Sequence, residues 1–338
     1  MTPAEGRNIE RIAVLGGGAW GTALALVAAR AGRSVRLWAR DADIVRALNE
    51  DNANPRYLPG VTIDPPLFAT TALDEALVDA DAVLLVTPAQ TTRAMAENLA
   101  SRLAPGTPVI LCAKGIERDT GLLLGDVLRE AAPGVMPAVL SGPSFAGDVA
   151  RGLPTAVTIA AADGKIADRL SAALASPQFR PYAATDLTGV QIGGALKNVL
   201  AIACGAVAGK QWGASALAAL TARGFAELTR LGLALGAQRE TLAGLSGLGD
   251  LVLTCGSAQS RNFAFGEALG KGASVASLTA EGQKLAEGVH SAAVAETLAA
   301  RHGVELPICR AVSAVLDGRL SIDDALTELM TRPLKREA

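Results

Sequence analysis

Lys197 is the residue in this sequence best suited to move a proton at a reacting carbon–oxygen group. It lies in the apolar segment from Gln191 to Leu200, which has the composition of a buried helix. On such a helix Gly193, Gly194 and Ala201 share its face, and these small residues are expected to leave a hollow beside the charge. Burial or a neighbouring cation would let a lysine act as a base. The alternative is a lysine whose long stem reaches solvent.

Two other charged residues have spacings that suit the same chemistry. Lys114 directly follows an apolar run, where a cation would lie at the carboxyl end of a strand and would orient a ligand. It would also favour the neutral amine of Lys197. Asp250, in Gly-Leu-Gly-Asp-Leu, follows a glycine-flanked turn and is predicted to hold Lys197 by a charge-assisted hydrogen bond. The alternative for Asp250 is a surface helix cap.

Two polar segments have the composition of an anion or polar-ligand site. Ser260-Arg261-Asn262 precedes the helical pattern Phe263 to Leu269, so a hydroxyl, a guanidinium and an amide would meet at a helix start and suit a phosphate. The alternative is an ordinary helix N-cap followed by an exposed arginine, which would have the same three-residue sequence. The segment from Ser141 to Phe145 combines small residues with hydroxyls, and either approaches a polar ligand or forms a turn.

A glycine-rich loop lies near the start of the chain. Gly16-Gly17-Gly18-Ala19-Trp20-Gly21 fits G-x-G-x-x-G, follows the apolar run Ile12 to Leu15 and opens a helical pattern. In that context the first glycine allows a tight turn, the second lets the backbone approach a pyrophosphate, and the third lets helix and strand pack closely. The alternative is a glycine turn without a ligand. The context favours a dinucleotide site.

Arg40 bears on which dinucleotide is bound. An NAD-selective site usually carries an acid at the end of the second strand, where a carboxylate binds the ribose hydroxyls. Here Arg40 takes that place and Asp41 follows it. Because a guanidinium suits phosphate oxygens, we predict that NADP(H) is accepted. The alternative is a surface arginine.

The elements that must position these residues change character along the chain. Strand-like runs alternate with helical patterns such as 19–31, 41–49 and 91–103, which predicts right-handed crossovers and a mostly parallel, Rossmann-type α/β sheet. From 189 onward the pattern is helical. We therefore predict a dinucleotide-binding domain over 9–188 and an all-helical substrate and catalytic domain over 189–332. The expected strands are Arg11–Leu15, Ser34–Trp38, Asp81–Thr87, Pro108–Ala113, Met136–Leu140 and Thr155–Ala160.

Composition excludes several other classes of protein. Half of the 338 residues are hydrophobic and the net charge is −2, so no global field attracts nucleic acid. The apolar run Val199 to Ala208 ends too soon to span a membrane. The polar N-terminus lacks a signal-peptide pattern, which predicts a cytoplasmic protein. Four cysteines and two histidines lack metal-ligand spacing, so no metal is expected.

These motifs together resemble bacterial NAD(P)-dependent glycerol-3-phosphate dehydrogenases, over about Ile12 to Leu316. The most specific are, in order, L-S-G-P-S-F-A from Leu140, G-A-L-K-N-V from Gly194, G-L-G-D-L from Gly247 and S-R-N from Ser260. The resemblance implies interconversion of sn-glycerol 3-phosphate and dihydroxyacetone phosphate with NADP or NAD. It also implies supply of glycerol 3-phosphate for phospholipid synthesis.

The same resemblance implies residue roles. Lys197 is similar to the family's proton acceptor for the C2 hydroxyl, with Lys114 and Asp250 beside it as catalytic residues. Implied substrate contacts are Lys114, Gly142, Ser144, Lys197, Asp250, Ser260, Arg261 and Asn262. To the loop residues Gly16, Gly18, Ala19 and Gly21 the resemblance adds cofactor contacts at Trp20, Arg40, Lys114, Ala146, Arg261, Leu285 and Glu287. The sequence departs from the family pattern at Ser215, Leu217, Gly256 and Phe263, which bears on affinity and on feedback regulation.

The resulting hypothesis is a two-domain enzyme with its active site in the cleft between the domains. Lys197 removes the C2 hydroxyl proton while hydride leaves C2, and Arg261 with Ser260 and Asn262 holds the phosphate. Another small hydroxy acid or phosphorylated ketone is the alternative substrate. A module that senses nicotinamide cofactor without catalysis is the alternative function, and it would have no use for Lys197, Lys114 and Asp250 together. The Ala-rich helical half is compatible with a homodimer interface.

Overall fold

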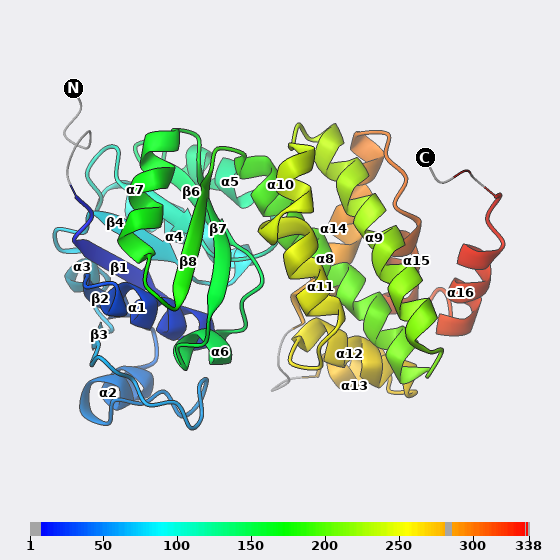
Figure 1. Ribbon diagram of the computed structural model, residues 1–338, viewed down its shortest axis with the longest axis horizontal. Coiled ribbons are helices and arrows are strands. Elements are labelled where there is room, and N and C mark those ends of the chain that lie inside the picture. The colour runs from blue at the N-terminus through cyan, green and yellow to red at the C-terminus, as the bar shows by residue number, and fades with distance from the viewer. Residues whose placement is uncertain (1–7, 281–285, 335, 337–338) are drawn as a thin grey trace. The chain divides into compact units, whose positions relative to one another are not determined.

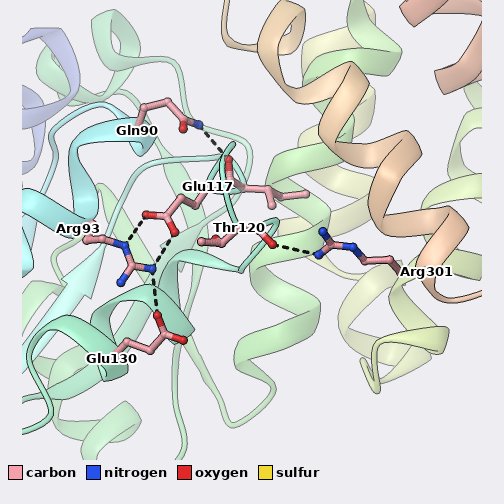
Figure 2. A network of polar contacts seen from close by, with 7 residues as sticks. Gln90, Arg93, Glu117, Thr120, Glu130 and Arg301 are labelled. Atoms are coloured by element: carbon pink, nitrogen blue, oxygen red, sulfur yellow. Dashed lines mark hydrogen bonds and ion pairs between the residues drawn. The ribbon is translucent and has the colours of Figure 1, made fainter.

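The computed structural model describes residues 8–280, 286–334 and 336, and it divides into two units (Figure 1). The first unit runs to Glu117 and resumes from Leu122 to Gln191. The second takes Arg118–Gly121 and all residues from Ile192. The chain therefore passes between the units three times. Within the second unit, the guanidinium of Arg301 donates to the carbonyl of Thr120 at 2.9 Å and ties down that short segment (Figure 2).

The first unit is built on one eight-stranded sheet in the order β3-β2-β1-β4-β5-β6-β7-β8. Neighbouring strands are parallel except β6 and β7, which are antiparallel. The predicted mostly parallel sheet is confirmed, and the two edge strands β3 and β8 are additions that the pattern did not indicate. The strands are β1 Arg11–Leu15, β2 Ser34–Trp38, β3 Phe68–Thr70, β4 Ala82–Leu85, β5 Pro108–Leu111, β6 Met136–Ser141, β7 Thr155–Ala161 and β8 Phe179–Ala184.

Helices cover both faces of this sheet, because successive strand residues point to opposite sides. Val14 of β1 packs with Leu24 in one core cluster, whereas Leu15 packs with Leu99 in another. All four side chains are fully buried. The helical segments of this unit are α1 Ala19–Arg30, α2 Ala42–Glu50, α3 Leu73–Leu77, η1 Ala89–Thr91, α4 Thr92–Ala100, α5 Leu124–Ala131, α6 Ala146–Ala150 and α7 Gly164–Leu174.

Every regular element among the described residues of the second unit is helical, which confirms the predicted helical C-terminal domain. Its first helix, α8, begins at Leu187, which is five residues before the point where the chain enters the second unit at Ile192. The four cysteines of the chain are buried free thiols. The segments are α8 Leu187–Gly209, α9 Ala214–Ala234, α10 Arg239–Ala243, the π-helical turn η2 Leu245–Gly249, α11 Asp250–Cys255, α12 Arg261–Gly270, α13 Val275–Leu278, α14 Glu287–Arg301, α15 Pro307–Leu316 and α16 Ile322–Met330.

Glycines let α8 and α12 cross with backbone against backbone. A Cβ added to Gly205 would lie 2.0 Å from the carbonyl oxygen of Phe263, and one added to Gly209 would lie 2.2 Å from that of Glu267. On the facing helix, a Cβ on Gly266 would lie 2.0 Å from the carbonyl oxygen of Ile202. No side chain fits at these points. The crossing therefore fixes the register of α12 along α8.

One helix among the described residues, α8, is long and apolar enough to cross a membrane by length and composition. Of its most apolar window, 78% is buried inside the protein. The core helix of a protein without membrane spans passes the same test.

Glu227 of α9 is a buried carboxylate that caps another helix. Its side-chain oxygens accept hydrogen bonds from the backbone N–H of Ile308 at 2.7 Å and of Cys309 at 3.2 Å, in the first turn of α15. Burial raises the pKa of Glu227, although those two backbone donors act to lower it. Desolvation outweighs the hydrogen bonds at this site.

We predict that this carboxyl makes stability fall with rising pH. Above pH 4.5, the ordinary pKa of glutamate, the folded chain keeps a proton that the unfolded chain has released. The free energy of unfolding therefore declines as the pH rises through the raised folded-state pKa. Glu227→Gln keeps the shape and does not titrate, so its decline should be smaller. Urea unfolding of both proteins between about pH 4 and about pH 8 measures this. Parallel profiles would contradict it.

Candidate active site

Lys197 lies in the interior of the second unit, bound to two side chains of α11. Its Nζ donates to Oδ1 of Asp250 at 2.6 Å and to Oγ1 of Thr254 at 2.8 Å. Asp250 is 1% exposed and Lys197 is 6% exposed, so neither is a surface residue. The solvent-reaching lysine and the surface cap are both excluded. A short, buried, charge-assisted hydrogen bond holds the ammonium in one orientation.

The space that Gly193 was predicted to leave open beside Lys197 is filled. A Cβ added to Gly193, one turn before Lys197, would lie 2.4 Å from the carbonyl oxygen of Ser246 and 2.9 Å from the Cα of Gly247. The backbone of η2 therefore occupies the space that the glycine leaves. This close approach matters for the site, because η2 leads directly into Asp250 at the start of α11.

Gly288, at the start of α14, links Asn198, the residue after Lys197, to Asn262 of the Ser-Arg-Asn segment. A Cβ added to Gly288 would lie 2.5 Å from the carbonyl oxygen of Asn198 and 2.9 Å from Oδ1 of Asn262. The backbone N–H of Gly288 donates to that same Oδ1 at 2.9 Å. The residue after Lys197, the start of α12 and the start of α14 therefore meet at one point.

The three residues of that segment have different surroundings. Ser260 is buried and its hydroxyl accepts from the backbone N–H of Phe263 at 3.3 Å, so it caps α12. Asn262 is buried and uses its Oδ1 on Gly288. Arg261 is exposed in the first turn of α12. A guanidinium at a helix N-terminus, where the helix dipole also favours anions, is well placed for a phosphate.

In the first unit, three predicted substrate contacts converge on one carbonyl group. Lys114 follows β5, and its Nζ donates to the carbonyl oxygen of Gly142 at 3.2 Å. Ser144 donates its hydroxyl to the same oxygen at 3.0 Å. Gly142 has a φ of +151°, and a Cβ there would lie 2.8 Å from the Cα of Val157. Only glycine lets this turn after β6 lie so close to β7.

The glycine loop has the geometry that its spacing predicts. Gly16 has a φ of +136°, and a Cβ there would lie 2.7 Å from the carbonyl oxygen of Val86. A Cβ on Gly21 would lie 1.8 Å from the carbonyl oxygen of Gly16, so helix and loop touch. Gly18 differs, because nothing lies within 4 Å of its added Cβ. Asn54 fixes the loop by donating to the carbonyl of Gly17 at 3.0 Å.

The surroundings of this loop fit a dinucleotide. Gly18 is the N-cap of α1 and supplies no side-chain acceptor, so the first N–H groups of the helix are left for a ligand. The loop lies at the carboxyl edge of β1, beside β4, where the strand order reverses and α/β sheets bind ligands. Thr87, just after β4, has a buried hydroxyl with no hydrogen-bond partner in the part of the chain that the structure describes.

Arg40 lies exposed after β2 and, among the described residues, makes no ion pair or hydrogen bond. The neighbouring Asp41 is engaged. One of its oxygens accepts from the backbone N–H of Asp43 at 2.9 Å, and the other pairs with Arg56 at 2.7 Å. The charge free for a ligand at this strand end is therefore positive.

The remaining predicted cofactor contacts are divided between the two units. Ala19, Trp20 and Ala146 are half-buried and pack against the same core cluster of the first unit. Glu287 is the first residue of α14, and Leu285 lies outside the described residues. Across 8–280, 286–334 and 336, no group of three or more His, Cys, Asp or Glu side chains could hold a metal ion.

Thr254 is a member of this site that sequence reasoning missed. Its hydroxyl binds Lys197 and lies 3.4 Å from Oδ1 of Asp250. The signal was present, because Thr254 is four residues after Asp250 in a helical pattern and residues at that spacing share a face.

The loop glycines give a test that separates folding from ligand binding. Gly18→Ala should leave stability unchanged and weaken NADPH binding, because the added methyl group occupies space that a pyrophosphate needs. Gly21→Ala should lower stability by about 1–3 kcal/mol, because the methyl group must displace backbone. Urea unfolding and NADPH fluorescence titration measure the two effects. Gly134→Ala, also in open space, is the control. Wild-type NADPH affinity in Gly18→Ala would contradict the expectation.

Known proteins similar to this chain cover both units. Residues 11–167 match the N-terminal domain, and residues 186–327 the C-terminal domain, of NAD-dependent glycerol-3-phosphate dehydrogenase. A glycerol-3-phosphate dehydrogenase (NAD(P)+) of Azorhizobium caulinodans is 59% identical over 329 residues, covering 97% of this chain and 99% of that protein. The corresponding protein of Parvibaculum lavamentivorans is 55% identical over 327 residues, covering 97% and 98%.

A solved structure agrees with both matches. The crystal structure of glycerol-3-phosphate dehydrogenase from Coxiella burnetii superposes with a TM-score of 0.90 at 38% sequence identity, covering 96% of this chain and 99% of that one. With both domains matched in order and close relatives over nearly the full length, the chain belongs to the NAD-dependent glycerol-3-phosphate dehydrogenase family.

Proposed function

We propose that this protein interconverts sn-glycerol 3-phosphate and dihydroxyacetone phosphate with NAD(P)+ and NAD(P)H, and so supplies glycerol 3-phosphate for phospholipid synthesis. The observation that carries the proposal is the buried Lys197, bound at once to Asp250 and Thr254. An ammonium inside a protein is costly unless it is paired and hydrogen-bonded. A buried ammonium held in one orientation suits proton transfer, and an exposed arginine at the start of α12 suits a phosphorylated substrate.

Lys197 supplies the proton in this mechanism. When the ketone is reduced, an N–H of Lys197 passes its proton to the C2 oxygen as negative charge builds there. In the reverse direction the neutral amine removes the proton of the C2 hydroxyl. Asp250 and Thr254 keep Nζ oriented through both states. Lys114, held beside Gly142 and Ser144, is the second cation proposed to contact the substrate.

The dinucleotide supplies or accepts the hydride when it is bound. The residues proposed to hold its pyrophosphate are Gly16, Gly18 and the first turn of α1, which offers free N–H groups. Arg40 is proposed to accept a 2′-phosphate, because it is exposed beside an acid that is already engaged. NADP(H) is therefore expected to serve as well as NAD(H).

Arg261 is proposed to bind the substrate phosphate. It is the exposed member of its segment, whereas Ser260 and Asn262 are buried and use their side-chain oxygens inside the protein. Those two position the arginine by fixing the start of α12. The cytoplasm is the proposed compartment, and a homodimer the proposed assembly.

The proposal is tested by following NADPH and NADH oxidation with dihydroxyacetone phosphate, with unphosphorylated dihydroxyacetone as the paired control. Oxidation with the phosphorylated ketone alone supports both the reaction and the phosphate site. A clear loss of NADPH use but not of NADH use in Arg40→Ala supports the role of Arg40. Folded protein that binds NADPH but oxidises it with neither ketone would contradict the proposal and favour a cofactor-sensing module.

A further inference from the structure

The loop that carries Lys114 is held by a charged contact outside the residues assigned above. Arg93 of α4 grips Glu117 with two parallel hydrogen bonds, from Nε at 3.0 Å and from Nη2 at 2.8 Å (Figure 2). The same Nη2 also reaches Glu130 of α5 at 2.9 Å. A bidentate arginine–carboxylate pair fixes the direction of both side chains as well as their separation. Only two residues, Gly115 and Ile116, separate Glu117 from Lys114.

Other contacts restrain the backbone between those two residues. Gln90 donates to the carbonyl of Ile116 at 2.9 Å. The N–H of Glu117 donates to the carbonyl of Leu122 at 3.0 Å, next to an antiparallel bridge between Ile116 and Leu123. Gly115 lies so close to η1 that an added Cβ would be 2.8 Å from the Cβ of Ala89. The segment after Lys114 is thus clamped against η1 and α4.

This ion pair differs from the ordinary surface pairs of the same unit. The Glu117 side chain is 11% exposed, whereas the acidic partners in pairs such as Arg102–Asp74 are mostly solvated. A nearly buried carboxylate needs its cation, and removing the cation would let the carboxylate turn outward to find water. Because Glu117 is part of the clamp, that movement would carry the loop with it.

We propose that Arg93 and Glu117 are positioning residues for the reaction: they hold the loop after β5 so that Lys114 stays beside Gly142 and meets the substrate. The inference rests on the proposed function, since it uses the role assigned to Lys114. A misplacement of about 1 Å in a substrate-orienting group can reduce the rate about a hundredfold. Arg93 touches neither substrate nor cofactor in this proposal.

The first test compares two arginine variants. Arg93→Met is expected to lower kcat/KM for dihydroxyacetone phosphate by about tenfold to a hundredfold, while the Kd for NADPH changes much less. Arg102, just past the end of α4, pairs with Asp74 at 2.7 Å and is the matched control. Arg102→Met should retain wild-type kcat/KM. Glu117→Gln, which keeps the shape of the side chain and loses its charge, should lower kcat/KM as much as Arg93→Met does. It replaces Arg93→Met in this test if Arg93→Met fails to fold.

The second test is a double-mutant cycle with Lys114→Ala. If Arg93 acts through Lys114, Arg93→Met lowers kcat/KM in the wild-type background and adds no further loss in the Lys114→Ala background. If Lys114→Ala is impaired but measurable and Arg93→Met lowers kcat/KM by the same factor in that background as in the wild type, or if Arg93→Met alone causes no loss, the positioning role is overturned and the proposed function stands. Full activity in Lys114→Ala would instead overturn the assignment of Lys114 itself, and the inference with it.

Discussion

Lys197→Met is expected to lower kcat for dihydroxyacetone phosphate reduction by about a thousandfold, with little change in NADPH affinity. The thioether keeps the length and bulk of the side chain but has no proton to give, and general acid–base catalysis typically contributes about 10²- to 10⁴-fold. Steady-state kinetics and NADPH titration measure both quantities. Lys210→Met is the matched control, because Lys210 follows the end of the same helix and pairs with Asp323 on the surface at 2.6 Å.

Loss of folding must be separated from loss of chemistry in this variant. Lys197→Met leaves Asp250 buried without its cation, which costs roughly 3–5 kcal/mol in comparable sites. Adding Asp250→Asn removes the unpaired charge, so the double variant should recover much of the stability in urea unfolding. It should not recover kcat. If folded Lys197→Met turns over at the wild-type rate, Lys197 does not transfer the proton.

Arg261→Ala is expected to raise KM for dihydroxyacetone phosphate roughly a hundredfold, since loss of a charge-assisted contact to a dianion costs about 2–3 kcal/mol. The weak activity with unphosphorylated dihydroxyacetone, if measurable, should not change. Because Arg261 is exposed, stability should also stay the same. Lys271→Ala, just past the other end of α12, is the control.

Ser260→Ala provides the contrast to Arg261→Ala. The Ser260 hydroxyl caps α12, so its removal should cost about 1 kcal/mol of stability and raise KM far less than Arg261→Ala. If instead Ser260→Ala raised KM strongly and Arg261→Ala did not, the phosphate would be held by the hydroxyl, and the assignment within this segment would be reversed.

The sequence predicted the centre of the sheet better than its edges. Strands β1 and β2 lie at the predicted residues. β1 is an almost continuous buried apolar run, as is typical of parallel sheets, and in β2 the buried Val35 and Leu37 alternate with more exposed residues. Strand β3 has only three residues, and β8 alternates buried with exposed residues around Pro181. Edge strands are short and half-solvated, so their pattern is weak. These segments are strands because they pair with a neighbouring strand, and the sequence of one segment does not reveal that pairing.

The candidate active site was also predictable only in part from the sequence. The pairing of Lys197 with Asp250 follows from chemistry, because a buried cation must find a carboxylate. What filled the space beside Gly193 was not predictable, because glycine fits an open hollow and a close backbone contact equally well. The contact between Arg93 and Glu117 could not be predicted from the sequence either, because α4 and Glu117 come together only when the sheet has folded.

Backbone lies against backbone where α8 and α12 cross, and no rotamers separate the two helices at that point. Ligand binding therefore has no side chains to immobilise where Gly205 and Gly209 meet the backbone of α12, and little conformational entropy is lost at this crossing when a molecule binds. Glycerol phosphate offers few atoms to hold. For so small a ligand, a frame that is rigid beforehand leaves most of the electrostatic attraction available as net affinity.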